Sequence, residues 1–251
     1  MLDRKYLIDF LDNYLNISKF SDSTYNGLQI EGKQTIENIC FAVDSSLDTF
    51  QKAFDKNCDL LIVHHGLIWN GLKNILGSVK ERIAFLLKNQ INLYVSHLPL
   101  DYHPEIGNNI QILKTLKANP KEPRLSSFYI GEYQHPLSQK LWLENIKNLI
   151  NPQYKLMNFH SGPIQQFAVS SGSFNLSMLD EAIQSGIKTI LTGEPSGQSM
   201  FYYPAKENQL NIIFAGHYET ETFGLKALKD VIFNYFRNDL SLAFIDLPTG
   251  W

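Results

Sequence analysis

Apolar runs and amphipathic segments alternate along the first hundred residues of the chain. Between residues 3 and 15, apolar residues recur at the spacing of an amphipathic helix. The strands expected after it cover residues 38–44, 59–66 and 91–101, and the helices expected between them cover residues 45–57 and 78–90, with Ser45 or Ser46 as the cap of the first. This order of strand, helix, strand, helix, strand predicts a largely parallel sheet with helices packed on its faces.

The second half of the chain repeats this pattern. Residues 166–194 align with residues 40–66, because each segment has a strand containing Ala-Val, a serine-containing turn, a helix and a second apolar strand. Residues 211–221 then align with residues 92–101. Each of these two segments has an apolar strand followed by a histidine and, four residues later, by a carboxylate. The repeat predicts an α/β fold made of two related halves.

The predicted halves are residues 1–125 and 126–251, with the join in residues 118–165. Proline disfavours long regular elements, and five prolines fall in this segment. They are Pro120, Pro123, Pro136, Pro152 and Pro163. We therefore expect the segment to be irregular.

Polar side chains follow the expected strands at the point where each strand ends. They are His64 with His65, His97 with Asp101, and His217 with Glu221. In open parallel sheets, ligands bind at the carboxyl ends of the strands. One histidine at a strand end is more often a hydrogen-bonded structural residue. Three such ends, two with a carboxylate at a matching offset, favour a shared metal site.

The residue types favour two divalent ions. Imidazole and carboxylate together suit zinc, iron or manganese, and no cysteine is placed to form a thiolate site. Neighbouring residues of a strand point to opposite faces, so His64 and His65 would not bind one ion from an extended strand. If the chain leaves strand geometry at Gly66, each imidazole can bind its own ion. A carboxylate such as Glu221 can then bridge two ions about 3.5 to 4 Å apart.

Other polar residues have two interpretations each. Glu194 aligns with the histidine pair across the repeat, and it would accept a proton or hold a metal-bound water, or else lie at a helix N-terminus. His103 is expected at a helix start, while Asn108 and Asn109 would contact a ligand or cap a turn. Two further histidines are interpreted as surface residues: His135 and His160.

Composition narrows the class of protein. The 251 residues, 44% of them hydrophobic, can bury the core of one large domain or two ordinary ones. A formal net charge of −3 and the absence of long basic runs do not favour nucleic acid or an acidic membrane as partner. No apolar run approaches the roughly 20 residues of a membrane span, so the expected location is the cytoplasm. Cys40 and Cys58 are interpreted as buried thiols.

Five motifs together resemble those of the Nif-three-like dimetal proteins, often named GTP cyclohydrolase 1 type 2 homologues. The motifs are NGLQIEG, LLIVHHGLIW, NLYVSHLPLDYHPEIGNN, TGE and AGHYETE. The resemblance runs from about residue 20 to the C-terminus, and it implies metal ligands at His64, His65, Asp101, His217 and Glu221, with Glu221 as the bridge. It places His97 next to the ligands, as a supporting group or proton shuttle. It also implies two α/β halves with the metals in the cleft between them, and a hexameric ring.

The resemblance implies a metal-dependent hydrolase acting on GTP or another nucleotide-like small molecule. A non-catalytic metal-binding ring that serves as regulator, metal carrier or assembly partner is the alternative, and an open coordination position would favour the enzyme. An α/β scaffold without metal is a third interpretation. Glu219 stands where small residues are common in the family, and it adds negative charge that would change substrate or metal preference.

Overall fold

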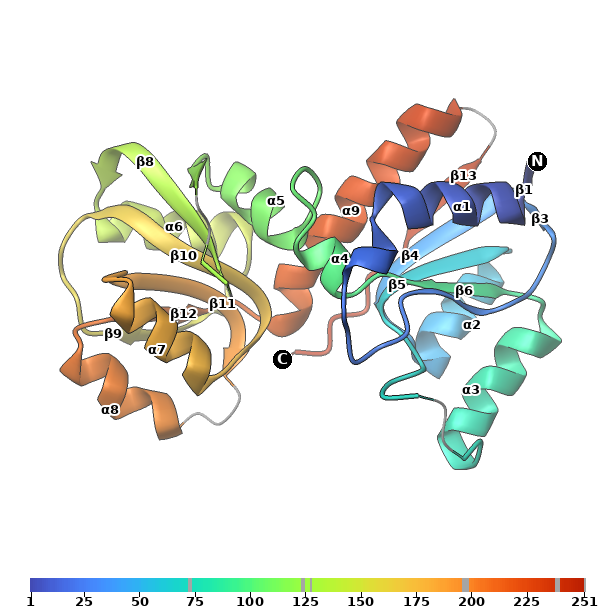
Figure 1. Cartoon of the computed structure of the whole chain (residues 1–251), viewed down its shortest axis with the longest axis horizontal. Coiled ribbons are helices and arrows are strands. Elements are labelled where there is room, and N and C mark those ends of the chain that lie inside the picture. Colours follow the sequence, from blue (N-terminus) through green and yellow to red (C-terminus); the bar gives the residue numbers. More distant parts are fainter. Residues whose placement is uncertain (72–73, 123–124, 127, 196–198, 238–239, 251) are drawn as a thin grey trace. The chain divides into compact units, whose positions relative to one another are not determined.

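The computed structural model describes residues 1–71, 74–122, 125–126, 128–195, 199–237 and 240–250. They form two compact units (Figure 1). Unit 1 comprises residues 1–107 with 224–247, and unit 2 comprises residues 108–223 with 248–251. Within the described residues, no helix is both long and apolar enough to span a membrane.

Unit 1 contains a five-stranded sheet and a two-stranded ribbon. The strands are β1 (Leu2–Asp3), β2 (Gly27–Ile30), β3 (Thr35–Ile36), β4 (Asn38–Asp44), β5 (Leu60–His65), β6 (Asn92–Val95) and β13 (Ser241–Phe244). The helices are α1 (Arg4–Tyr14), the short 3-10 helix Ile17–Lys19, α2 (Leu47–Asp55), α3 (Gly77–Lys88) and α4 (Leu98–Asp101). The sheet has the order β13-β4-β5-β6-β2, in which all neighbours are parallel except β2, which runs antiparallel to β6.

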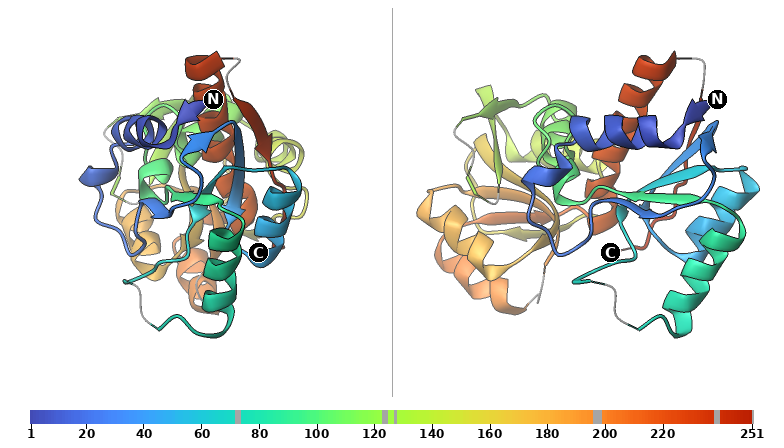
Figure 2. Two further views of the ribbon diagram at one scale, coloured as in Figure 1. Left: turned by 90° about the vertical axis from the view of Figure 1, so that its right-hand side faces the viewer. Right: turned by 45° about the vertical axis from the view of Figure 1, so that its right-hand side comes forward.

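Alternation along β5 divides its side chains between the two faces of this sheet. Leu61 and Val63 belong to a buried cluster with Phe50 of α2 and Leu86 of α3, so these two helices cover one face (Figure 2). The opposite face carries Ile62 and His64. The first residue of the pair of histidines therefore points away from α2 and α3.

Helix α1 covers that opposite face. Tyr94 is the register partner of Ile62 in the neighbouring strand and therefore lies on the same face. Its hydroxyl donates to the Asp12 carboxylate of α1 at 2.8 Å. Both faces of the sheet are thus covered, which is the arrangement that a largely parallel sheet requires.

Most predicted elements of unit 1 are confirmed to within one or two residues, including the cap of α2, where the Ser46 hydroxyl accepts from the Thr49 amide at 3.1 Å. The strand expected over residues 91–101 is partly wrong, because β6 ends at Val95 and α4 follows. Pro99 lies in the first turn of α4, where proline is tolerated and favours the helix. His97 is therefore at a helix start.

Unit 2 contains a six-stranded mixed sheet. Its strands are β7 (Asn119–Lys121), β8 (Tyr129–Leu137), β9 (Lys155–Asn158), β10 (Ile164–Phe174), β11 (Thr189–Pro195) and β12 (Asn211–Phe214). The order is β7-β8-β10-β11-β12-β9, with β10, β11 and β12 parallel and the others antiparallel to their neighbours. The helices are α5 (Asn108–Thr115), α6 (Gln139–Leu149), α7 (Leu176–Gln184), α8 (Ser199–Glu207) and α9 (His217–Phe236), which begins in unit 2 and continues into unit 1.

The expectation that residues 118–165 lack long regular elements is wrong, because β8 and α6 fall in this segment. The described prolines lie at positions where they do not interrupt these elements. Pro120 is in β7, an edge strand, and Pro136 lies where the register of β8 against β10 shifts. Pro152 follows α6 and Pro163 precedes β10, while Pro123 lies outside the described residues.

Each unit thus has three parallel strands linked by helices in the same order. In unit 1 the order is β4, α2, β5, α3, β6, and in unit 2 it is β10, α7, β11, α8, β12. The relation of two halves, residues 1–125 and 126–251, by an internal repeat stays a prediction, and the compact units have other bounds. In both units, the candidate site residues follow the carboxyl ends of these strands.

Candidate metal-binding site

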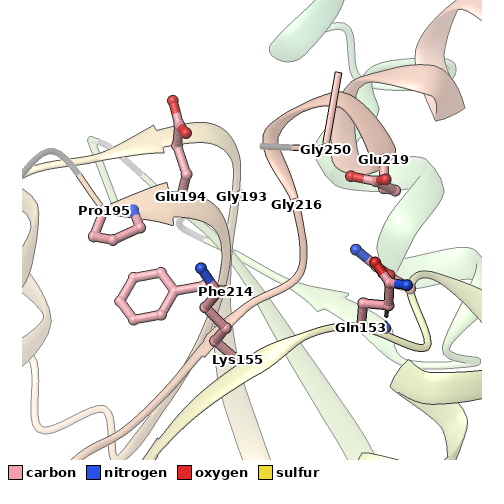
Figure 3. Close-up of a pocket in the computed structure, with 10 residues that line it drawn as sticks. Gln153, Lys155, Gly193, Glu194, Pro195, Phe214, Gly216, Glu219 and Gly250 are labelled. Carbon is pink, nitrogen blue, oxygen red and sulfur yellow. Dashed lines mark hydrogen bonds between the residues drawn. The ribbon is translucent and has the colours of Figure 1, made fainter. Parts of the chain in front are cut away.

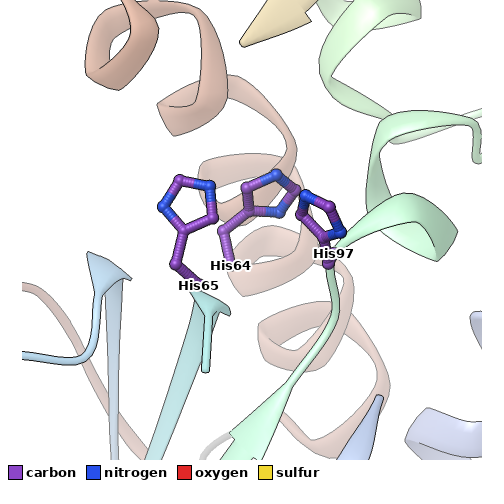
Figure 4. Close-up of side chains that lie close together, drawn as sticks. All are labelled: His64, His65 and His97. Atoms are coloured by element: carbon purple, nitrogen blue, oxygen red, sulfur yellow. The ribbon is translucent and has the colours of Figure 1, made fainter. Parts of the chain in front are cut away.

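Three histidines of unit 1 lie together at the carboxyl ends of β5 and β6 (Figure 4). The ring centroid of His64 is 4.9 Å from that of His65 and 5.0 Å from that of His97, and the last two are 5.8 Å apart. Each ring offers one nitrogen within 4.8 Å of the other two. Because β5 ends at His65, the chain leaves strand geometry at Gly66, which is the condition under which each imidazole could bind its own ion.

Gly66 is required by the loop that follows the histidine pair. A Cβ atom there would lie 2.5 Å from Gln29 Nε2 and 2.6 Å from a methyl group of Val95. The Gln29 amide oxygen accepts from the backbone amides of Leu67 (2.8 Å) and Ile68 (3.1 Å). Gln29, from the NGLQ segment, therefore holds this loop by its backbone.

All three rings turn Nδ1 toward an oxygen that can only accept. These pairs are His64 with the Ser96 carbonyl (2.9 Å), His65 with the Asp44 carboxylate (2.7 Å) and His97 with the Asp22 carboxylate (3.0 Å). We therefore assign the proton to Nδ1, which leaves the lone pair on Nε2. Histidines that bind metal usually show this arrangement, with the second nitrogen donating to a carbonyl or carboxylate.

His103 shows the opposite arrangement. Its Nε2 donates to the Tyr14 carbonyl at 3.1 Å, while its Nδ1 accepts from the amides of Glu105 (3.2 Å) and Ile106 (3.3 Å). Burial lowers the pKa of His103, which favours the neutral ring. Nε2 is used by the end of α1 and Nδ1 by the loop that contains the histidine, so His103 is a structural residue.

Asp101 joins the histidine cluster of unit 1. Its carboxylate Oδ2 is 3.5 Å from Nε2 of His64, and only 10% of the Asp101 side chain is exposed. His97 precedes the first residue of α4 and Asp101 is the last, so one helical turn brings both side chains to the same end of the sheet. The cluster in unit 1 therefore comprises three imidazoles and the Asp101 carboxylate.

Unit 2 holds a second cluster around His217, the first residue of α9. Its Nε2 is 3.1 Å from Oε1 of Glu221, one turn further along the helix, and its Nδ1 is 2.8 Å from Oε1 of Glu194. Burial alone would lower the pKa of His217, but the Glu221 and Glu194 carboxylates outweigh it and raise the pKa to about 9. A metal ion at this ring would have to displace a tightly held proton.

Glycine makes room for Glu221. Gly172 of β10 has φ +68°, and a Cβ there would collide with Oε1 of Glu221. Its backbone amide donates to the Thr220 hydroxyl at 3.1 Å, and this hydroxyl donates to the Gly216 carbonyl at 2.8 Å. The backbone of β10 is thereby held against the start of α9, close to the carboxylate.

The remaining candidates lie outside these clusters. Asn109 accepts from the backbone amide of Ser171 at 2.7 Å, which links α5 to β10, and Asn108 is fully buried beside it in α5. His135 is exposed and His160 is half-buried, so both have the surface character expected of them.

Two carboxylates that the sequence patterns do not single out support the histidines of unit 1. Asp44 ends β4 and is the register partner of His65. Asp22 lies in a loop, with 2% of its side chain exposed, and it accepts from Asn26 Nδ2 at 2.9 Å and from the Leu98 amide at 3.1 Å. Burial alone would raise the pKa of Asp22, but hydrogen bonds from His97 and Asn26 hold this pKa well below its usual range.

Substituting Asp22→Asn should release the His97 ring. The variant loses a buried carboxylate with several donors, so we expect a loss of about 2 kcal/mol in unfolding free energy. In nitrogen NMR spectra, the His97 signals should change from one tautomer toward a mixture. Asp9→Asn, at an exposed position of α1, is the control. An unchanged His97 spectrum in Asp22→Asn would show that Asp22 does not set the tautomer.

Comparison with known proteins gives matches over the whole chain. A model of the Duf34/NIF3 (NGG1p interacting factor 3) family matches residues 2–249. A relative from Pyrococcus horikoshii, named GTP cyclohydrolase 1 type 2 homolog, is 40% identical over 255 residues, covering 99% of this chain and 100% of the relative. A relative of the same name from Deinococcus radiodurans is 36% identical, covering 99% of this chain and 95% of the relative.

Solved structures agree with this assignment. A structure described as protein ybgI, of unknown function, has a TM-score of 0.90 and 32% identity, covering 99% of both chains. TTHA1606 from Thermus thermophilus has a TM-score of 0.83 and 34% identity, covering 100% of both chains. The matches confirm the family resemblance and the mixed α/β fold expected from the sequence.

Proposed function

The chain belongs to the Duf34/NIF3 family, and we propose that it binds two divalent metal ions and uses them in a hydrolytic reaction. The proposed ligands are His64, His65, Asp101, His217 and Glu221, with Glu221 bridging the two ions. In this proposal the two halves are related by a repeat, and the ligands of both meet in the cleft between them. Zinc, iron and manganese suit this set of imidazoles and carboxylates.

The orientation of the imidazoles carries the proposal. His64, His65 and His97 in unit 1, and His217 in unit 2, each turn Nδ1 toward an oxygen acceptor, so Nε2 is the coordinating atom in every ring. A histidine with a purely structural role can have either orientation. His103, for example, donates through Nε2 instead of Nδ1. The donor set therefore fits divalent metal.

The chain's own residues would then position and exchange protons. Bound divalent ions would supply an activated water and charge stabilisation for attack at an electrophilic carbon or phosphorus. His97, whose Nδ1 is held by Asp22, would take up and return a proton at Nε2. Glu194 would keep His217 in its coordinating orientation through the 2.8 Å contact. Asp44 would do the same for His65.

A nucleotide-like small molecule is the proposed substrate. The relatives bear the name GTP cyclohydrolase 1 type 2 homolog, which makes GTP the first compound to test. We also propose a cytoplasmic homo-oligomer, a hexameric ring, whose mass light scattering on the purified protein would measure.

The test is metal content by mass spectrometry, on protein purified without a histidine tag, followed by an assay of formate release from GTP. We expect about two ions per chain in the natural sequence and strongly reduced metal in His64→Ala. His135→Ala is the matched control, because this histidine is exposed. Two ions without turnover on any nucleotide would favour the non-catalytic metal-binding ring. Less than one ion after reconstitution would contradict both functions.

A further inference from the structure

Unit 2 contains a hollow of about 210 Å³ at the carboxyl end of β12, beside the start of α9 (Figure 3). The side chains that matter here are Gln153, Lys155, Glu194, Pro195, Phe214 and Glu219. Pockets for whole drug-sized ligands measure about 300 to 1,000 Å³. A hollow of this size suits one flat ring system, with the rest of the ligand outside.

One side of the hollow combines an aromatic ring with a cation. Phe214 of β12 and Lys155 of β9 are register partners in an antiparallel pair, so their side chains project from the same face of the sheet. Figure 3 shows both on the same side of the hollow as Pro195. Within the described part of the chain, no carboxylate lies within ion-pair distance of the Lys155 ammonium. An anionic ligand group can therefore pair with it.

The other side presents an unpaired carboxylate on a rigid support. Glu219 lies in the first turn of α9, and its Oε2 occupies the space that a Cβ at Gly216 would need. Among the described residues, no side chain or backbone donor contacts this carboxylate. Asn151 fixes the neighbouring chain, since its Nδ2 donates to the Ala215 carbonyl at 3.1 Å and its Oδ1 accepts from the Gln153 amide at 2.8 Å.

These groups define the chemistry of a ligand. Two carboxylate oxygens pair best with two adjacent N–H donors, which the edge of a 2-amino-4-oxo-pyrimidine ring provides. Pro195 and Phe214, the latter only 6% exposed, offer apolar contact to the edge of the flat ring, and Lys155 offers a positive charge to an anionic substituent. An adenine ring presents a bare nitrogen acceptor at the same edge, which the Glu219 carboxylate would repel.

We propose that this hollow binds the 2-amino-4-oxo-pyrimidine ring of an anionic guanine or pterin compound, with Glu219 reading the ring edge and Lys155 pairing with the anionic group. The inference rests on the proposed function in one respect. Glu194 both lines the hollow and contacts His217, so a bound ring would lie beside a proposed metal ligand. Binding itself needs only residues of unit 2.

The experiment is calorimetric titration of the full chain with guanosine, inosine and adenosine monophosphates and with pterin-6-carboxylate. Guanosine monophosphate should bind about tenfold more tightly than inosine monophosphate, which lacks the 2-amino group, and adenosine monophosphate should bind more weakly still. Binding of pterin-6-carboxylate but not of guanosine monophosphate would identify pterins as the source of the ring. Equal binding of all three nucleotides, or binding of none of the four compounds, would overturn the proposal.

Three variants test whether Glu219 and Lys155 have the proposed roles in ligand binding. Glu219→Gln should lose the preference for guanosine over inosine monophosphate. Lys155→Met should weaken both about tenfold and leave their ratio unchanged. Lys147→Met, at an exposed position of α6, is the control and should change neither. If Glu219→Gln still prefers guanosine monophosphate over inosine monophosphate to the same extent, the Glu219 carboxylate does not recognise the ring.

The His64→Ala variant separates this proposal from the proposed function. His64 belongs to unit 1, so its loss should reduce bound metal while guanosine monophosphate still binds in unit 2. Metal without nucleotide selectivity in the natural sequence would contradict the ring site alone. Nucleotide selectivity without metal would contradict the proposed function and leave the ring site supported.

Discussion

Glu221→Gln is expected to remove most of the bound metal while the protein stays folded. Glutamine keeps the shape of the side chain but loses the charge of the carboxylate proposed to bridge two ions, so both positions should weaken. His217 would also lose one of its two carboxylate partners, the one 3.1 Å from its Nε2. Mass spectrometry should find less than half of the natural metal content. Glu207→Gln, at an exposed position of α8, is the matched control.

Thermal unfolding provides a second measurement of the same variant. A metal that binds only the folded chain stabilises it by mass action, by about 2.7 kcal/mol at a free concentration one hundred times the dissociation constant. Added zinc should therefore raise the melting temperature of the natural protein much more than that of Glu221→Gln. Combining this variant with His64→Ala should cost little more than either change alone, because the proposed site is already lost. Full metal content in Glu221→Gln would contradict the bridging role.

Local spacing explains why the grouping of several candidate side chains could be predicted. His217 and Glu221 are four residues apart at the start of α9, and this separation puts both side chains on one face of a helix. His97 and Asp101 have the same offset around α4, although the sequence pattern was interpreted there as a continuing strand. The spacing of four residues predicts that the two side chains lie close together even where the predicted element is wrong, because four residues make about one helical turn.

The supporting carboxylates depend on contacts that sequence spacing does not contain. Asp44 meets His65 through the parallel register of β4 and β5, and this register forms only when two separate strands pair. Asp22 is 75 residues from His97 and lies in a loop without hydrophobic periodicity. For Asp44, the end of the strand predicted over residues 38–44 is a signal that could have been used, because the next predicted strand carries the histidine pair at its own end. For Asp22 no such pattern exists.

Prolines in residues 118–165 show how tertiary context changes a local preference. Their number predicts an irregular segment, but Pro120 occupies an edge strand and Pro136 a shift in register, which are the positions in a sheet that tolerate proline. Sequence composition gives only the number of prolines. Whether a helix or strand forms depends on where each proline lies in it, and that position is known only once the strands have paired.

Gly172→Ala should strongly weaken metal binding in unit 2 even though it adds a single methyl group far from any proposed ligand in sequence. The new Cβ would collide with Oε1 of Glu221 and come within 3.4 Å of His217 Nε2. The carboxylate must then leave its position beside His217, and metal affinity should fall by about 100-fold or more. Equilibrium dialysis against zinc measures this change.

Gly186→Ala is the control that separates the collision from backbone strain. Gly186 has φ +71°, close to the +68° of Gly172, but nothing lies within 4 Å of its Cβ position. Both alanines should cost about 1 kcal/mol or more of unfolding free energy, because each forces an L-residue into the left-handed region. Only Gly172→Ala should lose metal. If the two variants retain equal metal, the space that Gly172 leaves for Glu221 has no part in binding it. A selective loss would show that the shape of β10 positions the carboxylate, since the strain is common to both variants and the displaced side chain is not.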